Sequence, residues 1–291
     1  MNEPGFHPDS LIYSRVAIWG LGLMGGSLAL GIKRKCAWLA GIDLDPQIII
    51  QAMDRGLIDQ GSIKPQEVLN DIDVIILATP ISSILAILDE LPCIYPGTAF
   101  VMDLGSTKRT ILQKMNALPD RFDSIGAHPM CGKEKGSLNN AEAGIYQGAP
   151  FALVSHPGTT SQAKLLAEEI ARSIGSVPLW IDAETHDRWV AATSHVPFLV
   201  ANALAQATPF DAAPLIGPGF RSTARLAGSS AKMMADILET NGEYVKERIA
   251  QFKTFLERYE QLLEQKDFAI LADELEHGAE HYRALVEDRQ Q

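Results

Sequence analysis

Short apolar runs alternate with segments of helical spacing over the first two thirds of the chain. The runs are rich in β-branched residues, as buried strands are, and turn residues bound them. Strands that alternate with helices are typical of an α/β fold whose helices cover both faces of a parallel sheet. We therefore expect a sheet domain that ends near Asp182. Its predicted strands are RVAIWG (15–20), WLAGID (38–43), DVIILAT (73–79), AFVMDL (99–104), SIGAH (124–128), FALVS (151–155) and VPLWID (177–182).

The chain becomes helical after Asp182. Residues 183–207 have helical spacing, residues 211–219 form a Pro/Gly loop, and amphipathic segments follow. A small helical domain with few apolar residues often completes its core by dimerising. The pattern predicts two domains, residues 1–182 and 183–291, and a homodimer. Between 241 and 263 the apolar residues at helical spacing are Val245, Ile249, Phe252, Phe255, Leu256 and Leu262.

Composition narrows the class of protein. The 291 residues are 46% hydrophobic and carry a net charge of -11, which fits a globular chain and opposes broad attraction to nucleic acid or an anionic membrane. No run of about 20 uncharged apolar residues could span a bilayer, and MNEPGFHPDSLIYSR at the start lacks the apolar run of a signal peptide. Cys36, Cys93 and Cys131 are far apart and lack CxxC spacing, so we expect reduced thiols in a cytoplasmic protein.

A glycine-rich turn directly follows the first apolar run. In a GxGxxG of this kind the first glycine permits a tight turn, the second lets the backbone approach a pyrophosphate, and the third lets the helix pack on the strand. Free N–H groups at the helix start then favour an anion. Glycines also mark ordinary turns, so the motif alone leaves that alternative open. The predicted cofactor turn, GLGLMG, consists of Gly20, Leu21, Gly22, Leu23, Met24 and Gly25.

The acidic end of the second run supports a dinucleotide site. Asp43 lies about 20 residues beyond the glycines, where a carboxylate can accept hydrogen bonds from the adenosine ribose. It would repel a 2′-phosphate, and no Arg or Lys follows in LDPQ, so NAD is favoured over NADP. Asp45 could share this role, and either aspartate could instead cap the helix that begins at Pro46. Thr79 and Pro80 follow a later strand at the ligand-binding edge, although Pro80 could simply start a helix.

Two strand ends carry candidates for hydride chemistry. Ser106 and Lys108 follow AFVMD, where Ser106 could donate to a substrate oxygen or orient a base, or could cap a helix. His128 follows an apolar strand and is fixed by Pro129. As a neutral imidazole it could take a hydroxyl proton while a hydride leaves the same carbon; the alternative is a buried structural histidine.

The helical segment carries two more histidines. His186 and His195 are nine residues apart, which places them on opposite faces of a helix, so they cannot bind one metal ion together. We expect His186 to lie at the surface. Pro197 should kink the helix just beyond His195 and free backbone carbonyls there.

Two arginines suggest an anion site. Arg221 and Arg225 are four residues apart, and on a helix such like charges repel unless an anion compensates them. Arginine can bind a carboxylate through two parallel hydrogen bonds. A solvated basic face is the alternative.

A zinc-peptidase pattern near the C-terminus is a decoy. His277, Glu280 and His281 spell HxxEH, but only ten residues follow and the helix is highly charged. We therefore predict no metal site.

Five motifs in this order resemble the prephenate/arogenate dehydrogenase family over nearly the whole chain: GLGLMGGSLA, DLGSTK, GAHPMCG, HDRWVAATSHVP and GFRSTARLA. The resemblance implies a Rossmann NAD-binding domain followed by an all-helical dimerisation domain. It implies that His128 is the catalytic base and that Ser106 supports it and the substrate hydroxyl. It also implies that His195 lies in the substrate pocket and that Arg225 binds a substrate carboxylate. We expect Arg221 and Ser194 to contact the substrate as well.

The implied reaction removes the proton of the ring 4-hydroxyl, transfers the hydride of that carbon to NAD and releases the ring carboxylate as CO2. Many relatives have His where this chain has Phe198, Asp where it has Ser222 and Thr where it has Ala224. These departures leave prephenate and arogenate both open as substrates. A 3-hydroxyacid dehydrogenase, with Lys232 as its only nearby lysine, and a non-enzymatic NAD-binding module are the alternatives.

Overall fold

The computed structural model describes residues 10–133 and 136–287. The chain forms two compact units, Met1–Gly242 and Glu243–Gln291. The boundary expected at 182/183 lies inside the first unit, between its sheet and its helices, and stays a prediction. The first nine residues, on which the expectation of no signal peptide partly rests, are outside the described ranges. Within those ranges, no helix is both long and apolar enough to cross a membrane.

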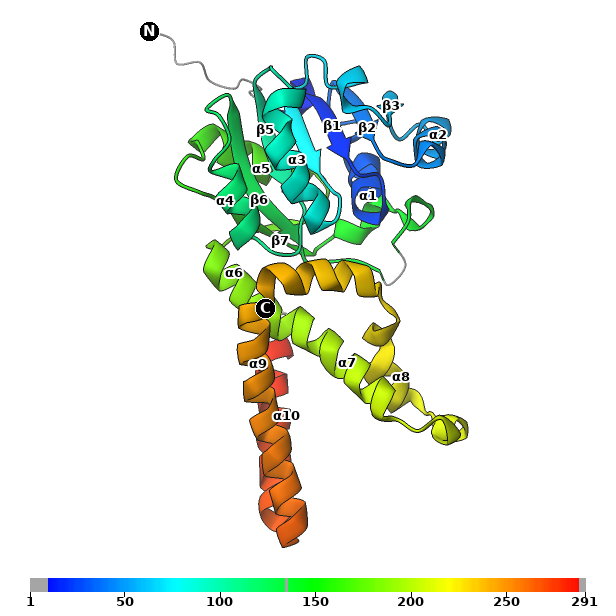
Figure 1. Ribbon diagram of the computed structural model, residues 1–291, viewed down its shortest axis with the longest axis vertical. Coiled ribbons are helices and arrows are strands. Elements are labelled where there is room, and N and C mark those ends of the chain that lie inside the picture. The colour runs from blue at the N-terminus through cyan, green and yellow to red at the C-terminus, as the bar shows by residue number, and fades with distance from the viewer. Residues whose placement is uncertain (1–9, 134–135, 288–291) are drawn as a thin grey trace. The chain divides into compact units, whose positions relative to one another are not determined.

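One eight-stranded sheet forms the centre of the first unit (Figure 1). Its strand order is β3-β2-β1-β4-β5-β6-β7-β8, and the first six strands are parallel. This is the order of a doubly wound dinucleotide-binding sheet, which binds its ligand where the order reverses, at β1 and β4. The strands are β1 (Arg15–Trp19), β2 (Trp38–Ile42), β3 (Gln60–Ser62), β4 (Val74–Leu77), β5 (Ala99–Asp103), β6 (Phe122–Pro129), β7 (Pro150–Val154) and β8 (Val177–Trp180).

The predicted fold class is confirmed, with two departures. All seven predicted strands are present, but β3 was not predicted, because QGS is short, polar and partly exposed at the sheet edge. In addition, β7 runs antiparallel to β6, and β8 is parallel to β7. The alternation of strands and helices does not encode the direction of a strand added at the edge.

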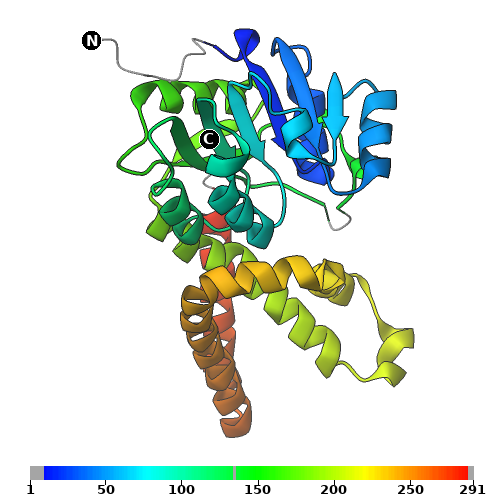
Figure 2. The ribbon, with the colours of Figure 1, turned by 45° about the horizontal axis from the view of Figure 1, so that its top comes forward.

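Helices cover both faces of the sheet (Figure 2). The side chains of β1 alternate between two cores: Val16 and Ile18 pack with α1, α2 and α5, whereas Ala17 and Trp19 pack with α3 and α4. This alternation follows from the pleat of a strand. The covering helices are α1 (Leu23–Ile32), α2 (Pro46–Asp54), α3 (Ile81–Ile94), α4 (Arg109–Met115) and α5 (Ser161–Ser173).

The rest of the first unit is helical. The predicted segment 183–207 is not one helix but α6 (Ala183–Val190), a π-helical turn (Ala191–His195) and α7 (Val196–Ala207). Then come α8 (Pro218–Ala224) and α9 (Ala231–Gln265), of which residues up to Gly242 belong to this unit. Phe198, Met234 and Ile237 extend the core of α3 and α4. Short 3-10 helices lie at Leu11–Tyr13, Pro65–Glu67, Leu138–Asn140, Ala143–Tyr146, Phe210–Leu215 and Arg225–Gly228.

The second unit contains the remainder of α9 and α10 (Phe268–Glu287). An ion pair of 3.2 Å between Arg258 Nε and Glu274 Oε1 links the two helices. The predicted helix over 241–263 is confirmed, although Asn241 itself has a non-helical backbone (φ -130°, ψ 15°). Of its apolar side chains, Val245 and Leu262 are buried, whereas Phe255 is 59% and Leu256 51% exposed.

Candidate active site

The glycine turn between β1 and α1 has the shape expected of a dinucleotide site. Gly20 has φ +96°, a left-handed conformation that side chains disfavour. A Cβ on Gly25 would lie 1.8 Å from the Gly20 carbonyl oxygen, so α1 packs directly on the turn. A Cβ on Gly22 would meet none of the described atoms within 4 Å. The first and third glycines are therefore needed for the fold, and the second leaves open space in front of the N-terminus of α1.

Asp43 ties this turn to the end of β2. Its carboxylate accepts hydrogen bonds from the backbone N–H of Leu21 (2.8 Å) and of Asp45 (3.0 Å). Asp45, not Asp43, caps α2, by accepting from the N–H of Gln47 (2.9 Å). Each carboxylate oxygen of Asp43 can accept a second hydrogen bond. The open space at Gly22 and these acceptors fit the pyrophosphate and ribose of NAD.

The remaining predicted cofactor residues lie around the same edge. Leu21 and Leu23 are buried, and Met24 is partly buried beside the core. Thr79 is partly buried just beyond β4. Pro80 directly precedes α3, so the helix-start interpretation is correct for it, and it lies at the switch point as well.

His128 lies near the end of β6 and faces a histidine on α6. Its Nδ1 is 3.0 Å from Nε2 of His186, and the two rings meet edge to face. The prediction that His186 lies at the surface is wrong: the side chain is 2% exposed. The amphipathic pattern of α6 did not predict this burial, because His186 packs against a residue distant in sequence, His128. Burial first, and then the nearby His186, Lys108 and His195, hold the pKa of His128 well below its ordinary 6.5.

Asp187 follows His186 and links α6 to α4. Its buried carboxylate accepts from the backbone N–H of Lys108 (2.7 Å) and of Arg109 (2.9 Å), and Oδ1 is 2.8 Å from Nδ1 of His186. The first turn of α4 is therefore capped from α6 rather than by Ser106, because Lys108 occupies the N-cap position. Ser106 is partly buried in the preceding bend.

A buried ion pair lies near His128. Lys108 Nζ donates to the carboxylate of Asp103 and to the carbonyl oxygen of Ala127 (2.7 Å), directly before His128. Asp103 also accepts from the N–H of Gly105 (2.7 Å). Burial raises the pKa of Asp103 and lowers that of Lys108, and their mutual attraction opposes both shifts. Sequence reasoning missed Asp103; its only signal was an acidic residue at the end of an apolar strand.

His195 ends the π-helical turn and is almost fully buried. The side-chain nitrogen of Asn241 is 2.8 Å from the carbonyl oxygen of Asp187 and 3.1 Å from Nδ1 of His195. A carbonyl only accepts, so this Asn241 atom is the NH2 group; Nδ1 of His195 then accepts and its Nε2 carries the proton. Burial lowers the pKa of His195 to about 4, with His186 contributing and Asp187 opposing. Asn241 was not predicted, because nothing in the sequence marks the kink that turns it inward.

The other predicted substrate residues lie on the helical segments that follow α6. Ser194 is partly buried next to His195. Arg221 is exposed on α8, which ends at Ala224, and Arg225 begins a separate 3-10 turn and is exposed. The two arginines therefore do not share one α-helix. Lys232 is exposed on α9.

The histidines near the C-terminus lie at the surface. His277, Glu280 and His281 are exposed on α10. Within the described ranges, no group of three His, Cys, Asp or Glu side chains is arranged to hold a metal ion.

Comparisons with known proteins agree with this arrangement. Two family models match the chain: "Prephenate dehydrogenase, nucleotide-binding domain" over residues 28–177 and "Prephenate dehydrogenase, dimerization domain" over residues 182–277. The chain is 28% identical to prephenate dehydrogenase of Bacillus subtilis over 264 residues, which cover 87% of this chain and 71% of that protein.

Two solved structures resemble nearly the whole chain. One is prephenate dehydrogenase from Aquifex aeolicus in complex with hydroxyphenyl propionate and NAD+ (27% identity, TM-score 0.86, 94% of this chain and 98% of that one). The other is Synechocystis arogenate dehydrogenase (25% identity, TM-score 0.79, 94% of this chain and 100% of that one).

A doubly wound sheet with a glycine turn after β1, an aspartate after β2 and a histidine of lowered pKa near the end of β6 defines the class of NAD-dependent oxidoreductases. Within this class, the chain belongs to the prephenate dehydrogenase family. The family predicted from the five motifs is thereby confirmed.

Proposed function

We propose that this enzyme oxidises and decarboxylates prephenate to 4-hydroxyphenylpyruvate with His128 as its general base. The observation that carries the proposal is the neutral imidazole of His128 at the carboxyl end of β6, where its low pKa keeps it ready to accept a proton. When bound, NAD+ supplies the hydride acceptor. His128 takes the proton of the ring 4-hydroxyl, and loss of the ring carboxylate as CO2 makes the ring aromatic.

Other side chains have positioning roles in this proposal. The proton on Nε2 of His195 can be donated to a substrate oxygen, and Ser106 can donate to the substrate hydroxyl. Arg225, with Arg221 nearby in sequence, is proposed to bind a substrate carboxylate, and Ser194 to line the pocket. Arginine suits this task because its planar guanidinium forms two parallel bonds to a carboxylate.

Two carboxylates near His128 bear on the choice of substrate. Asp103 is bound to Lys108, and Asp187 is bound to His186 and to two N–H groups of α4. Of the acidic side chains that the structure describes in this cluster, neither is left for the ammonium group that arogenate adds. This favours prephenate, whose side chain is a keto acid.

An absorbance assay that crosses prephenate and arogenate with NAD and NADP tests the proposal. We expect NADH to form with prephenate and NAD, and His128→Asn to lower kcat by about 10²- to 10⁴-fold while NAD binding persists. His277→Asn, the same exchange at an exposed site, should change neither. Failure of both substrates to yield NADH would overturn the assignment, and activity with arogenate alone would correct the substrate.

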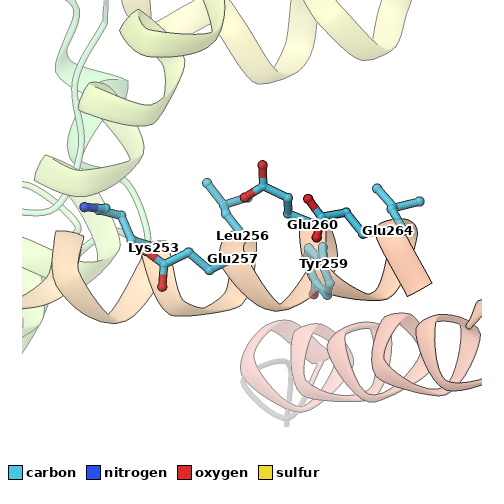
Figure 3. A pocket seen from close by; sticks show the side chains of 7 residues that line it. Lys253, Leu256, Glu257, Tyr259, Glu260 and Glu264 are labelled. Carbon is cyan, nitrogen blue, oxygen red and sulfur yellow. The ribbon is translucent and has the colours of Figure 1, made fainter. Parts of the chain in front are cut away.

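A homodimer in the cytoplasm is the proposed state of the enzyme. The second unit exposes apolar side chains along α9, and a shallow hollow there is lined by alternating apolar and charged side chains (Figure 3). Such a surface suits contact with a second copy of the chain. The family model matched to residues 182–277 describes a dimerisation domain. The cytoplasmic location follows the expectation from the spaced cysteines.

A further inference from the structure

A chain of hydrogen bonds runs from Asp187 through His186 to His128. Asp187 Oδ1 is 2.8 Å from Nδ1 of His186, and Nε2 of His186 is 3.0 Å from Nδ1 of His128. We infer that His186 and Asp187 are positioning residues that fix the proton of His128 on Nδ1 and leave its Nε2 bare. The inference rests on the proposed function, because it assigns a purpose to the bare nitrogen of the proposed base.

The order of protons follows from donor and acceptor chemistry. An ionised carboxylate can only accept, so Nδ1 of His186 must carry the proton of the first bond. A neutral imidazole carries one N–H, so Nε2 of His186 has a lone pair and accepts. The proton of the second bond therefore belongs to Nδ1 of His128. Its other nitrogen, Nε2, then has the lone pair that a general base needs.

Asp187, at one end of this series of hydrogen bonds, is held in a fixed orientation. The carboxylate of Asp187 also holds the N–H groups of Lys108 and Arg109 at the first turn of α4, and its side chain is fully buried. A fully buried carboxylate with three donors in place cannot rotate without losing hydrogen bonds, because its oxygens are shielded from solvent. It therefore presents one oxygen to His186 in a constant orientation.

The hydrogen-bonded series also bears on the charge that forms on His128 during the reaction. When His128 takes a proton it becomes an imidazolium where burial first, and then the nearby His186, Lys108 and His195, disfavour its charge. Lys108 is partly compensated by Asp103. The carboxylate of Asp187, reached through His186, is the negative end toward which the new charge can be stabilised. This arrangement has the logic of an aspartate that orients a histidine base in hydrolases.

Two substitutions of His186 separate positioning from packing. Glutamine can place its amide oxygen near the position of Nε2 and accept from His128, whereas leucine fills space without accepting. We expect His186→Leu to lower kcat by about 100-fold with KM for prephenate and for NAD within about threefold, and His186→Gln to recover at least about tenfold of that loss. A structural role alone would lower both variants together with thermal stability, and would overturn the inference.

A measurement without turnover reads the proton order directly. In enzyme labelled with ¹⁵N-histidine, with the His128 signals identified by their loss in His128→Asn, we expect a protonated Nδ1 and a bare Nε2. In His186→Leu the proton should redistribute toward Nε2. A protonated Nε2 in the unmodified enzyme would overturn the inference even if NADH forms. The expected spectrum without any NADH from prephenate or arogenate would instead refute the proposed function and leave the proton order standing.

Discussion

The imidazole of His195 lies where its charged form is disfavoured. Its pKa in the fold is about 4, against an ordinary value of 6.5 that the unfolded chain approaches. Between pH 4 and 6.5 the unfolded state therefore binds a proton at His195 that the native state does not bind. The contribution of His195 to native stability is fully present above about pH 6.5 and is lost as the pH falls toward 4.

This linkage predicts the acid sensitivity of the fold. Since one unit of difference in pKa corresponds to about 1.4 kcal/mol, His195 should cost the enzyme about 3 kcal/mol of unfolding free energy between about pH 6.5 and 4. Urea unfolding at several pH values measures this. In His195→Gln, which cannot titrate, the decline over this interval should be shallower. Equal slopes in the two proteins would contradict the assignment of this sensitivity to His195.

The low pKa of His128 predicts the pH profile of turnover. A base works in its neutral form, and burial together with His186 keeps His128 neutral well below pH 6.5. We therefore expect kcat/KM for prephenate to stay level as the pH falls from about 8 to 6.5 and to decline only at lower pH. Initial rates in buffers of constant ionic strength check this. A half-maximal value at or above pH 6.5 would show that another group controls the acid limb.

The sequence identified residue types at this site but not their partners. His128 was marked by its position after an apolar strand, and His195 by its motif. The contacts that set their protonation come from residues 58 and 46 positions away, His186 and Asn241. One-dimensional spacing cannot reveal such contacts, because they depend on how α6 packs beside α4 and on the kink of α9 at Asn241.

At the scale of elements, the turn between β1 and α1 makes two glycines differ in a testable way. Gly22→Ala adds a methyl group that meets open space, so the fold should persist with nearly unchanged thermal stability. The same methyl would occupy the space offered to the pyrophosphate, so the Kd for NAD should rise at least about tenfold. Calorimetric titration with NAD measures it. Unchanged affinity would move the pyrophosphate away from this turn.

Gly25→Ala is the matched contrast in the same turn. Its methyl group would lie 1.8 Å from the carbonyl oxygen of Gly20, and backbone cannot yield cheaply. We expect a loss of at least about 2 kcal/mol in the free energy of unfolding, along with weaker NAD binding. Chemical denaturation checks this. A variant as stable as the unmodified enzyme would mean that α1 can shift away from the turn.

The sequence predicted helices and strands that have a periodic or continuous apolar pattern. It did not predict features that depend on packing against neighbouring elements. The apolar strands were found because burial on both faces imposes continuous apolar runs. The edge strand β3 has no such run, and the direction of β7 depends on its neighbour rather than on its composition. The interruption of the helix over 183–207 was expected at Pro197, but it takes the form of a π-helical turn that ends at His195, just before the proline.

At the scale of the whole molecule, the exposed apolar side chains of α9 predict a homodimer. The surface of α9 in the second unit exposes Phe255 and Leu256, side chains that a stable monomer would be expected to cover. Burying one such side chain is worth about 2 kcal/mol, and a two-fold symmetric dimer buries it twice. Replacing Phe255 by Glu should therefore weaken dimerisation on the order of 10²- to 10³-fold.

Sedimentation equilibrium of Phe255→Glu and of Lys246→Gln separates this effect from charge. Both exchanges lower the net charge by one, and Lys246 is exposed on the same helix. We expect the Lys246 variant to remain dimeric and the Phe255 variant to dissociate at micromolar concentration. Dimers of equal strength in both would place the contact on another surface, because a buried carboxylate without a partner could not leave an interface intact.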